Sequence, residues 1–290
     1  MIDRPQPLIV GCGYIGRRLA LRLRGQGHRP RGLVRSIASA QRLADDGITP
    51  LLCDLDCQAL PPGSTAGCDL YYLAPPPRQG TEETRVARLL QGLAESGQPR
   101  RIVYISTTGV YGDCGGAWVD ESWPARPQVD RARRRWDAEQ RLRAWRASGC
   151  GELVILRVAG IYGPGKLPLE RLRRGLPMVA PEEAPWTNRI HAEDLVQACL
   201  LAMQRGRDGG LYNACDGRPG NMADYFNRVA DAAGLPRPPV ISLAEADEKL
   251  SAGLRSYLAE SRRLRNDRLL NELGLELKYP DLDSGLASCF

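Results

Sequence analysis

The sequence predicts an α/β protein built on a doubly wound parallel sheet, with a small mixed carboxyl-terminal lobe. Three observations lead to this prediction. A glycine-rich turn stands between an apolar strand and an amphipathic helix near the amino terminus, strands and helices then alternate to about residue 165, and Pro- and Arg-rich sequence without strand periodicity follows. A chain of 290 residues has enough length for one large domain or two.

The glycine-rich turn lies at 11–16 and has the spacing G-x-G-x-x-G. Residues 8–10 predict a buried strand before it, and apolar residues at 15, 19, 20 and 23 predict a helix after it. Gly11 permits the turn, Gly13 lets the backbone approach a pyrophosphate, and Gly16 lets the helix pack close to the strand. A merely flexible glycine turn does not explain why all three spacings fit. We therefore expect a dinucleotide on the amino end of the helix, as in a Rossmann domain.

The second predicted strand, at 31–34, indicates which dinucleotide is bound. An NAD-binding fold usually carries an acid about 20 residues after the glycine turn, for the ribose 2′-hydroxyl. No acid stands there, and Arg35 and Ser36 follow the strand instead. An arginine beside a hydroxyl can bind a 2′-phosphate, so NADP is favoured over NAD. The alternative is that Arg35 is an ordinary surface arginine.

The remaining pattern continues the same alternation. We expect strands at 48–55, 69–73, 101–105, 153–158 and 211–214, and helices at 81–94, 130–147, from 195 onward, from the N-cap Asn221 onward, and at 250–258. The NAD(P)-binding Rossmann domain would comprise 1–165, completed by 188–214, and 166–187 with 215–290 would form a small substrate-binding lobe. A ligand would lie between them, over the carboxyl ends of the strands.

The cofactor site is expected where the first four strands end. It would comprise Gly11, Gly13, Tyr14, Ile15, Gly16, Arg35, Ser36, Asp54, Leu73 and Ala74. The fifth strand runs into a hydroxyl cluster at 106–108, and hydroxyls at the carboxyl end of a parallel strand face the ligand crevice.

Composition and charge are typical of a soluble globular protein, with 43% hydrophobic and 26% charged residues. The net charge of +6 is modest, and the arginine-rich run at 131–146 is interleaved with acids, which indicates a solvated helix face more than a nucleic-acid surface. Nine scattered cysteines without C-x-x-C spacing, no secretory pattern before the first strand and no membrane-length apolar run favour a cytoplasmic protein. No His/Cys/Asp cluster has metal-ligand spacing.

Together these motifs resemble the extended short-chain dehydrogenase/reductase superfamily, in an atypical branch of its NAD-dependent epimerase/dehydratase group. The resemblance runs along nearly the whole chain. It depends on GCGYIG at 11–16, VYISTTGVYG at 103–112, LRVAGIYGPG at 156–165, NRIHAEDL at 188–195, LYNACDG at 211–217 and LGLELKYP at 273–280.

The resemblance implies catalytic roles and also shows a departure. Family members use a Ser or Thr after the fifth strand to bind the substrate oxygen, which places that role on Thr107, with Ser106 beside it. The family's general acid/base is a Tyr with a Lys four residues on, and these positions hold Arg131 and Arg135 here. Arg135 can keep the hydrogen bonds to the cofactor ribose. Arg131 cannot replace the Tyr, because a guanidinium stays protonated and has no acceptor.

The missing tyrosine leaves three possibilities open. Another residue donates the proton, for which Tyr111, Tyr162 and Glu121 are candidates. Alternatively, Arg131 anchors an anionic substrate such as a phosphate or carboxylate. Thirdly, the protein binds a dinucleotide with little or no turnover, as a sensor or assembly partner. Because histidine ordinarily titrates near neutral pH, His191 is also a catalytic candidate, but in this motif it more often packs and positions its loop.

The sequence thus predicts an NAD(P)-linked epimerase, dehydratase or oxidoreductase whose turnover is left open. Its substrate would be a sugar nucleotide or a similar small polar molecule, with no nucleic acid or membrane partner. Family members are often dimers through the helices that flank the fifth strand. Leu89, Leu93, Trp136 and Trp145 fit such an interface, and they fit a buried core equally well.

Overall fold

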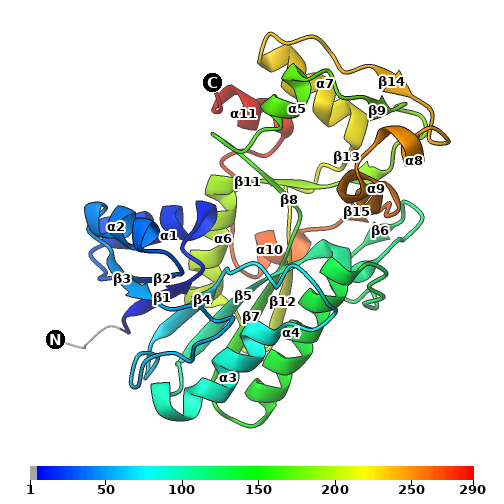
Figure 1. Cartoon of the computed structure of the whole chain (residues 1–290). Coiled ribbons are helices and arrows are strands. Elements are labelled where there is room, and N and C mark those ends of the chain that lie inside the picture. Colours follow the sequence, from blue (N-terminus) through cyan, green and yellow to red (C-terminus); the bar gives the residue numbers. More distant parts are fainter. Residues whose placement is uncertain (1–4) are drawn as a thin grey trace.

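A seven-stranded sheet forms the centre of the computed structural model, which describes residues 5–290 (Figure 1). The strand order is β12-β7-β5-β4-β1-β2-β3, and every neighbouring pair is parallel. The strands are β1 (Pro7–Val10), β2 (Arg31–Val34), β3 (Thr49–Leu52), β4 (Asp69–Tyr72), β5 (Arg101–Thr107), β7 (Glu152–Val158) and β12 (Gly210–Ala214). The chain reverses its direction of winding between β1 and β4, so the predicted doubly wound sheet is confirmed.

Helices cover both faces of this sheet and bury two separate cores. The helices that flank it are α1 (Tyr14–Gly25), α2 (Ile37–Asp45), α3 (Thr84–Ser96), α4 (Asp130–Ala147), α6 (Ala192–Arg205) and α10 (Asp267–Asn271). Ile9 packs in the core that α1 and α6 share, whereas Leu8 and Val10 pack in the core under α3 and α4. Because successive strand residues point to opposite faces, uninterrupted apolar strands fill both cores.

The residues considered for a dimer interface belong to one of these cores. Leu89, Leu93 and Trp145 are buried between the sheet and the α3–α4 pair. Only Trp136 remains half-buried. The core role of the first three is therefore confirmed, and they do not offer a surface to a second subunit.

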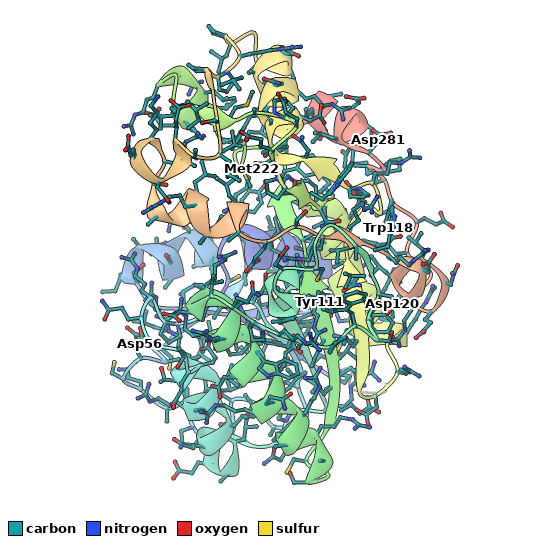
Figure 2. All side chains as sticks on the ribbon, turned by 90° about the vertical axis from the view of Figure 1, so that its right-hand side faces the viewer. Asp56, Tyr111, Trp118, Asp120, Met222 and Asp281 are labelled. Carbon is teal, nitrogen blue, oxygen red and sulfur yellow. The ribbon has the colours of Figure 1, made fainter. Side chains whose placement is uncertain are left out.

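The remaining elements form a smaller layer beyond the carboxyl ends of the strands (Figure 1). They are η1 (Thr108–Tyr111), β6 (Trp118–Val119), β8 (Gly160–Tyr162), α5 (Leu169–Arg173), β9 (Met178–Val179), β10 (Trp186–Thr187), β11 (Arg189–His191), β13 (Gly220–Asn221), α7 (Met222–Ala232), β14 (Val240–Ile241), α8 (Ala246–Lys249), α9 (Ala252–Leu258), β15 (Arg263–Leu264) and α11 (Leu282–Ala287). A third core, which includes Leu172, Met178, Phe226 and Leu286, holds most of these helices together. Figure 2 shows Met222 and Asp281 in this layer and Asp56 beside the sheet.

Several element predictions need correction. The strand predicted at 48–55 ends at Leu52, and Asp54 starts a turn in which its carboxylate accepts from the Asp56 amide at 3.0 Å. The helix predicted at 250–258 begins only at Ala252, as α9, and the short α8 before Leu250 was not predicted. The strand predicted at 101–105 extends to Thr107. The Asn221 cap is confirmed, because its side chain accepts from the Asp224 amide at 3.0 Å. No helix within 5–290 combines the length and the apolarity that a membrane crossing needs.

Candidate functional site

Two adjoining cavities lie over the carboxyl ends of the central strands. The glycine-turn cavity has about 1030 Å³ and runs from the turn after β1 to Arg35 and Arg135. The Thr107 cavity has about 460 Å³ and extends from β5 into the smaller layer. The two share three lining residues, Ile161, Lys166 and Tyr257. A ligand in one cavity would therefore border a ligand in the other.

The glycine turn has the geometry that a pyrophosphate needs. Gly11 has φ +91°, and a Cβ there would collide with the Ala74 backbone. A Cβ at Gly16 would lie 2.5 Å from the Gly11 carbonyl oxygen, so this glycine lets α1 pack against the turn. A Cβ at Gly13 would meet no atom within 4 Å. Gly13 is therefore not required by the fold itself, and the open space beside it fits a dinucleotide phosphate.

Arg35 and Ser36 lie at the far end of the glycine-turn cavity with Ser39. Ser36 caps α2, and its Oγ lies 2.9 Å from the Ser39 Oγ. The Arg35 guanidinium is 60% exposed and lies 3.7 Å from the Asp56 carboxylate, which Arg85 already binds at 2.6 Å. The cavity thus ends in an exposed cation beside two hydroxyls, which is a suitable environment for a phosphate.

The other predicted cofactor residues divide into two groups. Tyr14, Ile15, Leu73, Ala74 and Arg135 all line the glycine-turn cavity. Arg135 donates to the Ala74 carbonyl oxygen at 3.2 Å and to the Tyr104 hydroxyl at 3.3 Å. Asp54 does not line this cavity, because its carboxylate is used in the turn that follows β3.

The two predicted catalytic hydroxyls, on Ser106 and Thr107, point to opposite faces of the sheet because these residues are adjacent in β5. Thr107 lines the Thr107 cavity, and its Oγ1 accepts from the Gly109 amide at 3.2 Å. Its hydroxyl proton is therefore still available for a ligand. Ser106 points to the opposite face, where it is buried and donates to Glu139 at 2.5 Å. Ser106 is not brought to either cavity.

The three proposed replacements for the missing tyrosine also lie outside both cavities. The Tyr111 hydroxyl is buried and donates to Asn213 Oδ1 at 2.8 Å, and Glu121 accepts from the Asn213 amide at 2.7 Å. The Tyr162 hydroxyl donates to the Asp281 carbonyl oxygen at 3.1 Å. Burial raises the pKa of Tyr111 to about 12. These side chains hold loops together, so the structure argues against Tyr111 as a catalytic residue.

Comparisons with known proteins identify the chain's relatives. Residues 79–215 match the model of the NAD dependent epimerase/dehydratase family. Protein YeeZ of Escherichia coli K12 is 29% identical over 282 residues, which cover 94% of this chain and 96% of YeeZ. A solved structure of a functionally unknown conserved protein from Silicibacter pomeroyi is 36% identical, has a TM-score of 0.85 and covers 98% of this chain and 97% of its own. MoeE5, solved with UDP-glucose and NAD, has a TM-score of 0.76 at 22% identity, with 98% and 96% covered. The chain belongs to the NAD-dependent epimerase/dehydratase family.

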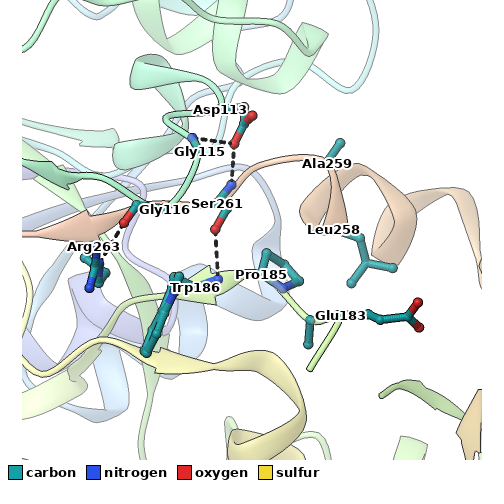
Figure 3. Close-up of a pocket in the computed structure, with 11 residues that line it drawn as sticks. Asp113, Gly115, Gly116, Glu183, Pro185, Trp186, Leu258, Ala259, Ser261 and Arg263 are labelled. Atoms are coloured by element: carbon teal, nitrogen blue, oxygen red, sulfur yellow. Dashed lines mark hydrogen bonds between the residues drawn. The ribbon is translucent and has the colours of Figure 1, made fainter. Parts of the chain in front are cut away.

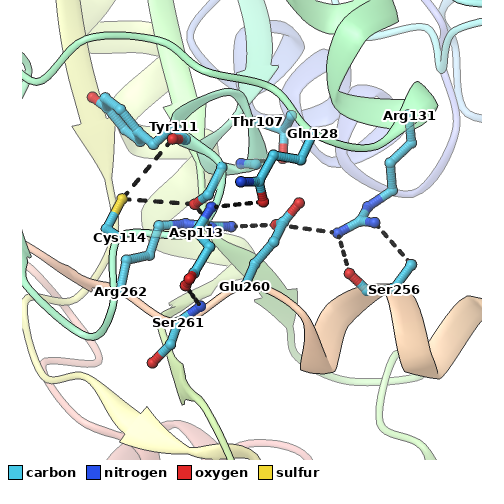
Figure 4. Close-up of polar contacts among 12 residues, drawn as sticks. Thr107, Tyr111, Asp113, Cys114, Gln128, Arg131, Ser256, Glu260, Ser261 and Arg262 are labelled. Atoms are coloured by element: carbon cyan, nitrogen blue, oxygen red, sulfur yellow. Dashed lines mark hydrogen bonds and ion pairs between the residues drawn. The ribbon is translucent and has the colours of Figure 1, made fainter.

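Arg131, at the position that the resemblance assigns to the family's tyrosine, faces the carboxyl-terminal layer (Figure 4). Arg131 donates to the Ser256 Oγ at 2.9 Å and to Glu260 Oε2 at 3.3 Å. Its guanidinium also lies 4.0 Å from the centroid of the Tyr257 ring. Arg131 is therefore already engaged by a segment of its own chain, and it is not a free anchor for an anionic substrate.

Several residues of the Thr107 cavity were not anticipated from the sequence. Glu260 has a side chain that is 1% exposed, and its Oε2 also accepts from Arg262 at 2.9 Å. Its Oε1 is buried with no hydrogen-bond partner among the described residues. Arg189 stacks on Tyr225 at 4.2 Å. Glu260 and Tyr225 lie outside the quoted family motifs, so no spacing rule could have found them. Arg189 lies within the motif at 188–195, and Lys166 directly follows the Gly-Pro-Gly turn, so these two carried a local signal.

His191 has a structural role in this family member, in agreement with the reading favoured from its motif. Its Nδ1 accepts from the Glu193 amide at 3.2 Å and so caps α6. The ring contacts Tyr162 and Tyr279, whose centroids lie 5.2 and 3.9 Å away. Burial lowers the pKa of His191 to about 4, which keeps the imidazole neutral at physiological pH.

A separate cavity of about 460 Å³ lies on the outside of the carboxyl-terminal layer (Figure 3). Asp113, Trp186, Ser261 and Arg263 are among its lining residues. The Asp113 carboxylate is used by the amides of Ser261, at 2.8 Å, and Gly115, at 3.2 Å. None of the predicted site residues lines this cavity. Residues 5–290 contain no group of three or more His, Cys, Asp or Glu side chains that could hold a metal ion.

Proposed function

We propose that this chain transfers a hydride between NADP(H) and a small polar substrate, as an epimerase, dehydratase or reductase. The observation that carries the proposal is the meeting of the glycine-turn cavity and the Thr107 cavity at Ile161, Lys166 and Tyr257. Hydride transfer requires direct contact between nicotinamide and substrate, and this junction would provide it. The nicotinamide would supply or accept the hydride when bound.

The residues around the glycine-turn cavity fit a dinucleotide. The backbone amides at the start of α1, beside the open space at Gly13, would bind the pyrophosphate, and Arg135 would hold the nicotinamide ribose. Arg35, with Ser36 and Ser39, would bind a 2′-phosphate, which favours NADP over NAD. The family relationship itself supports a nicotinamide cofactor without deciding between the two.

The lining of the Thr107 cavity supports an anionic substrate. Lys166 and Arg189 line it, and Arg131 and Arg262 line it as well but are paired with Glu260, the one acid among its lining residues. Arg189 has no carboxylate within 4.0 Å in the described part of the chain, so its charge is available to a ligand. We infer a phosphate-bearing substrate such as a sugar nucleotide, with Thr107 donating to the oxygen that reacts. MoeE5 binds UDP-glucose, which supports this inference by analogy of fold.

We also propose that the site lies between two lobes. Residues 1–165 with 188–214 would form the cofactor-binding domain, and 166–187 with 215–290 would form the substrate lobe. In this division α9 and the segment after it, which line the Thr107 cavity, come from the substrate lobe. Self-association of the chain stays a prediction.

Calorimetric titration with NADPH and then NADH, at one ionic strength, tests the cofactor assignment. We expect NADPH to bind at least about tenfold more tightly, because a charge-assisted contact to the 2′-phosphate adds about 1.5–3 kcal/mol. Arg35→Ala should abolish this preference and leave NADH binding unchanged. Arg237→Ala, which removes an exposed arginine of the carboxyl-terminal layer, is the matched control. Equal affinities in the wild type would refute the NADP assignment.

Turnover is tested with NADPH or NADP⁺ and a panel of UDP- and dTDP-sugars. Thr107→Ala should lower kcat at least tenfold while NADPH affinity stays within twofold of wild type, because Thr107 lines only the Thr107 cavity. Thr49→Ala, on the exposed side of β3, is the matched control. NADPH binding without any redox change and without conversion of any sugar nucleotide across the panel would instead establish a binding protein.

A further inference from the structure

We propose that Tyr257, on α9, is the proton donor and acceptor of the reaction, in place of the tyrosine that α4 lacks at position 131. The inference rests on the proposed function, because it assigns a role within hydride transfer. It is drawn from the position of Tyr257 between the two cavities and from the contacts that hold it there.

Tyr257 lies where the hydride would be transferred. Among residues 5–290, only Ile161, Lys166 and Tyr257 line both cavities, and the Ile161 side chain has no proton to exchange. The Lys166 Nζ lies 5.5 Å from the centroid of the Tyr14 ring, at the start of α1. That position is on the pyrophosphate side of the glycine-turn cavity, so Lys166 suits phosphate binding. Tyr257 is then the remaining candidate for acid–base chemistry at the junction.

Arg131 holds α9 against the amino end of α4. The guanidinium of Arg131 donates to the Ser256 Oγ and to Glu260 Oε2, on either side of Tyr257 in the chain, and it lies on the Tyr257 ring (Figure 4). Glu260 is in turn held by Arg262. The residue at the family's tyrosine position is thus the residue that docks another tyrosine. Arg131 is a positioning residue in this scheme.

Tyr257 also has access to solvent, which a recycling proton donor needs. It is 52% exposed, whereas Tyr71, Tyr72, Tyr104, Tyr111, Tyr162 and Tyr212 are buried. In the reductive direction, the carbonyl carbon of the substrate would accept a hydride from bound NADPH, which would form a C–H bond and leave NADP⁺. The C=O π pair moves onto the oxygen, which takes the proton from the Tyr257 hydroxyl. Water then returns a proton to the phenolate, and oxidation follows the reverse course.

Nitration by tetranitromethane, followed by mass spectrometry, tests the placement of Tyr257 without any turnover. We expect Tyr257 to be nitrated readily in the free protein and at least fivefold more slowly with saturating NADPH, because the residue lines the glycine-turn cavity. Tyr279 is half-buried outside both cavities, so NADPH should leave its nitration unchanged. Arg131→Met should reduce the protection of Tyr257, since it releases α9. Equal nitration of Tyr257 with and without NADPH would overturn the placement.

Kinetics of Tyr257→Phe test the chemical role. On the panel above we expect kcat to fall at least about 100-fold, in the range found when a general acid is removed, with the Kd for NADPH within twofold of wild type. Tyr279→Phe, the matched control, should retain wild-type kcat. Lys166→Met should weaken NADPH binding instead.

The outcomes separate this inference from the proposed function. A Tyr257→Phe variant with wild-type kcat would refute the role of Tyr257 and leave the proposed function intact. A wild type that binds NADPH but turns over no member of the panel would refute the proposed function, and the role of Tyr257 with it.

Discussion

Glu139 on α4 and Arg157 on β7 form a buried, bidentate ion pair beneath the Thr107 cavity. Arg157 Nε donates to Glu139 Oε1 at 3.1 Å, and its terminal nitrogen donates to Oε2 at 2.9 Å. Ser106 and Arg143 donate to the same carboxylate at 2.5 and 3.0 Å. The Glu139 and Arg157 side chains are 0% and 2% exposed. The pair joins the helix that carries Arg131 and Arg135 to the sheet that carries Thr107.

Removal of Glu139 should therefore destabilise the whole protein. Glu139→Ala leaves the Arg157 guanidinium buried without its partner, and we expect a loss of about 3–5 kcal/mol in the free energy of unfolding. Urea denaturation measures it. Asp130→Asn breaks an exposed pair with Arg133 on the same helix and should change stability by less than about 0.5 kcal/mol. Similar losses in the free energy of unfolding in Glu139→Ala and Asp130→Asn would contradict the stabilising role of the Glu139–Arg157 pair.

The glycines at 11 and 13 should respond differently to the same substitution. Gly13→Ala should leave the melting temperature near the wild-type value, because φ is −87° and the added Cβ meets nothing, yet NADPH affinity should fall at least about tenfold. Gly11→Ala should lower stability as well, since its φ is positive and its Cβ would meet the Ala74 backbone. Thermal melting and calorimetry on both variants check this. Undiminished NADPH binding by Gly13→Ala would show that no phosphate lies there.

The low pKa of His191 predicts how stability depends on pH. Burial lowers this pKa from 6.5 to about 4, so the unfolded chain binds the proton more tightly than the folded chain. Stability is therefore lost as pH falls from about 6.5 towards 4, by up to about 3 kcal/mol. Urea denaturation of wild type and His191→Asn across this range measures the free energy of unfolding of each. The difference between the two free energies should become smaller at low pH. His28→Asn, which removes the other histidine, is the matched control.

The raised pKa of Glu83, at the start of α3, predicts the opposite dependence of stability on pH. Glu83 is buried near Tyr72 and Arg135, and neither carboxylate oxygen has a hydrogen-bond partner of good geometry. Burial raises its pKa from 4.5 to about 7, so the folded state holds a proton that the unfolded state has lost, and stability falls as pH rises from about 4.5 to 7.

Glu83→Gln should remove this fall in stability. We expect the variant to match wild type near pH 4.5 and to be more stable at pH 8, by up to about 3 kcal/mol. Urea denaturation at the two pH values measures it. Glu82→Gln changes the neighbouring, largely exposed glutamate and should give no such pH-dependent gain. A gain for Glu83→Gln that is equal at both pH values would contradict the raised pKa.

The sequence by itself determined the sheet and the cofactor side of the site. Apolar strands, helical periodicity and the glycine spacing are local signals. The structure contains the elements they predict because each pattern lies within one strand, one helix or the turn between them. The Asn221 cap is also a local signal, because Asn221 and Asp224 are only three residues apart. Even the location of the hydroxyl cluster at the end of β5 followed from the strand pattern alone.

Only the tertiary structure decided which of these residues meet. Ser106 and Thr107 are adjacent in the sequence, but the pleat of β5 turns one towards Glu139 and the other into the Thr107 cavity. Arg131 meets Ser256 and Glu260 across separations of 125 and 129 residues. Such a contact depends on how the carboxyl-terminal layer packs over the sheet, and packing leaves no periodic signal in the chain. The sequence could therefore place Arg131 where the resemblance expects a tyrosine, and only the packing of α9 brings the Tyr257 ring against that arginine.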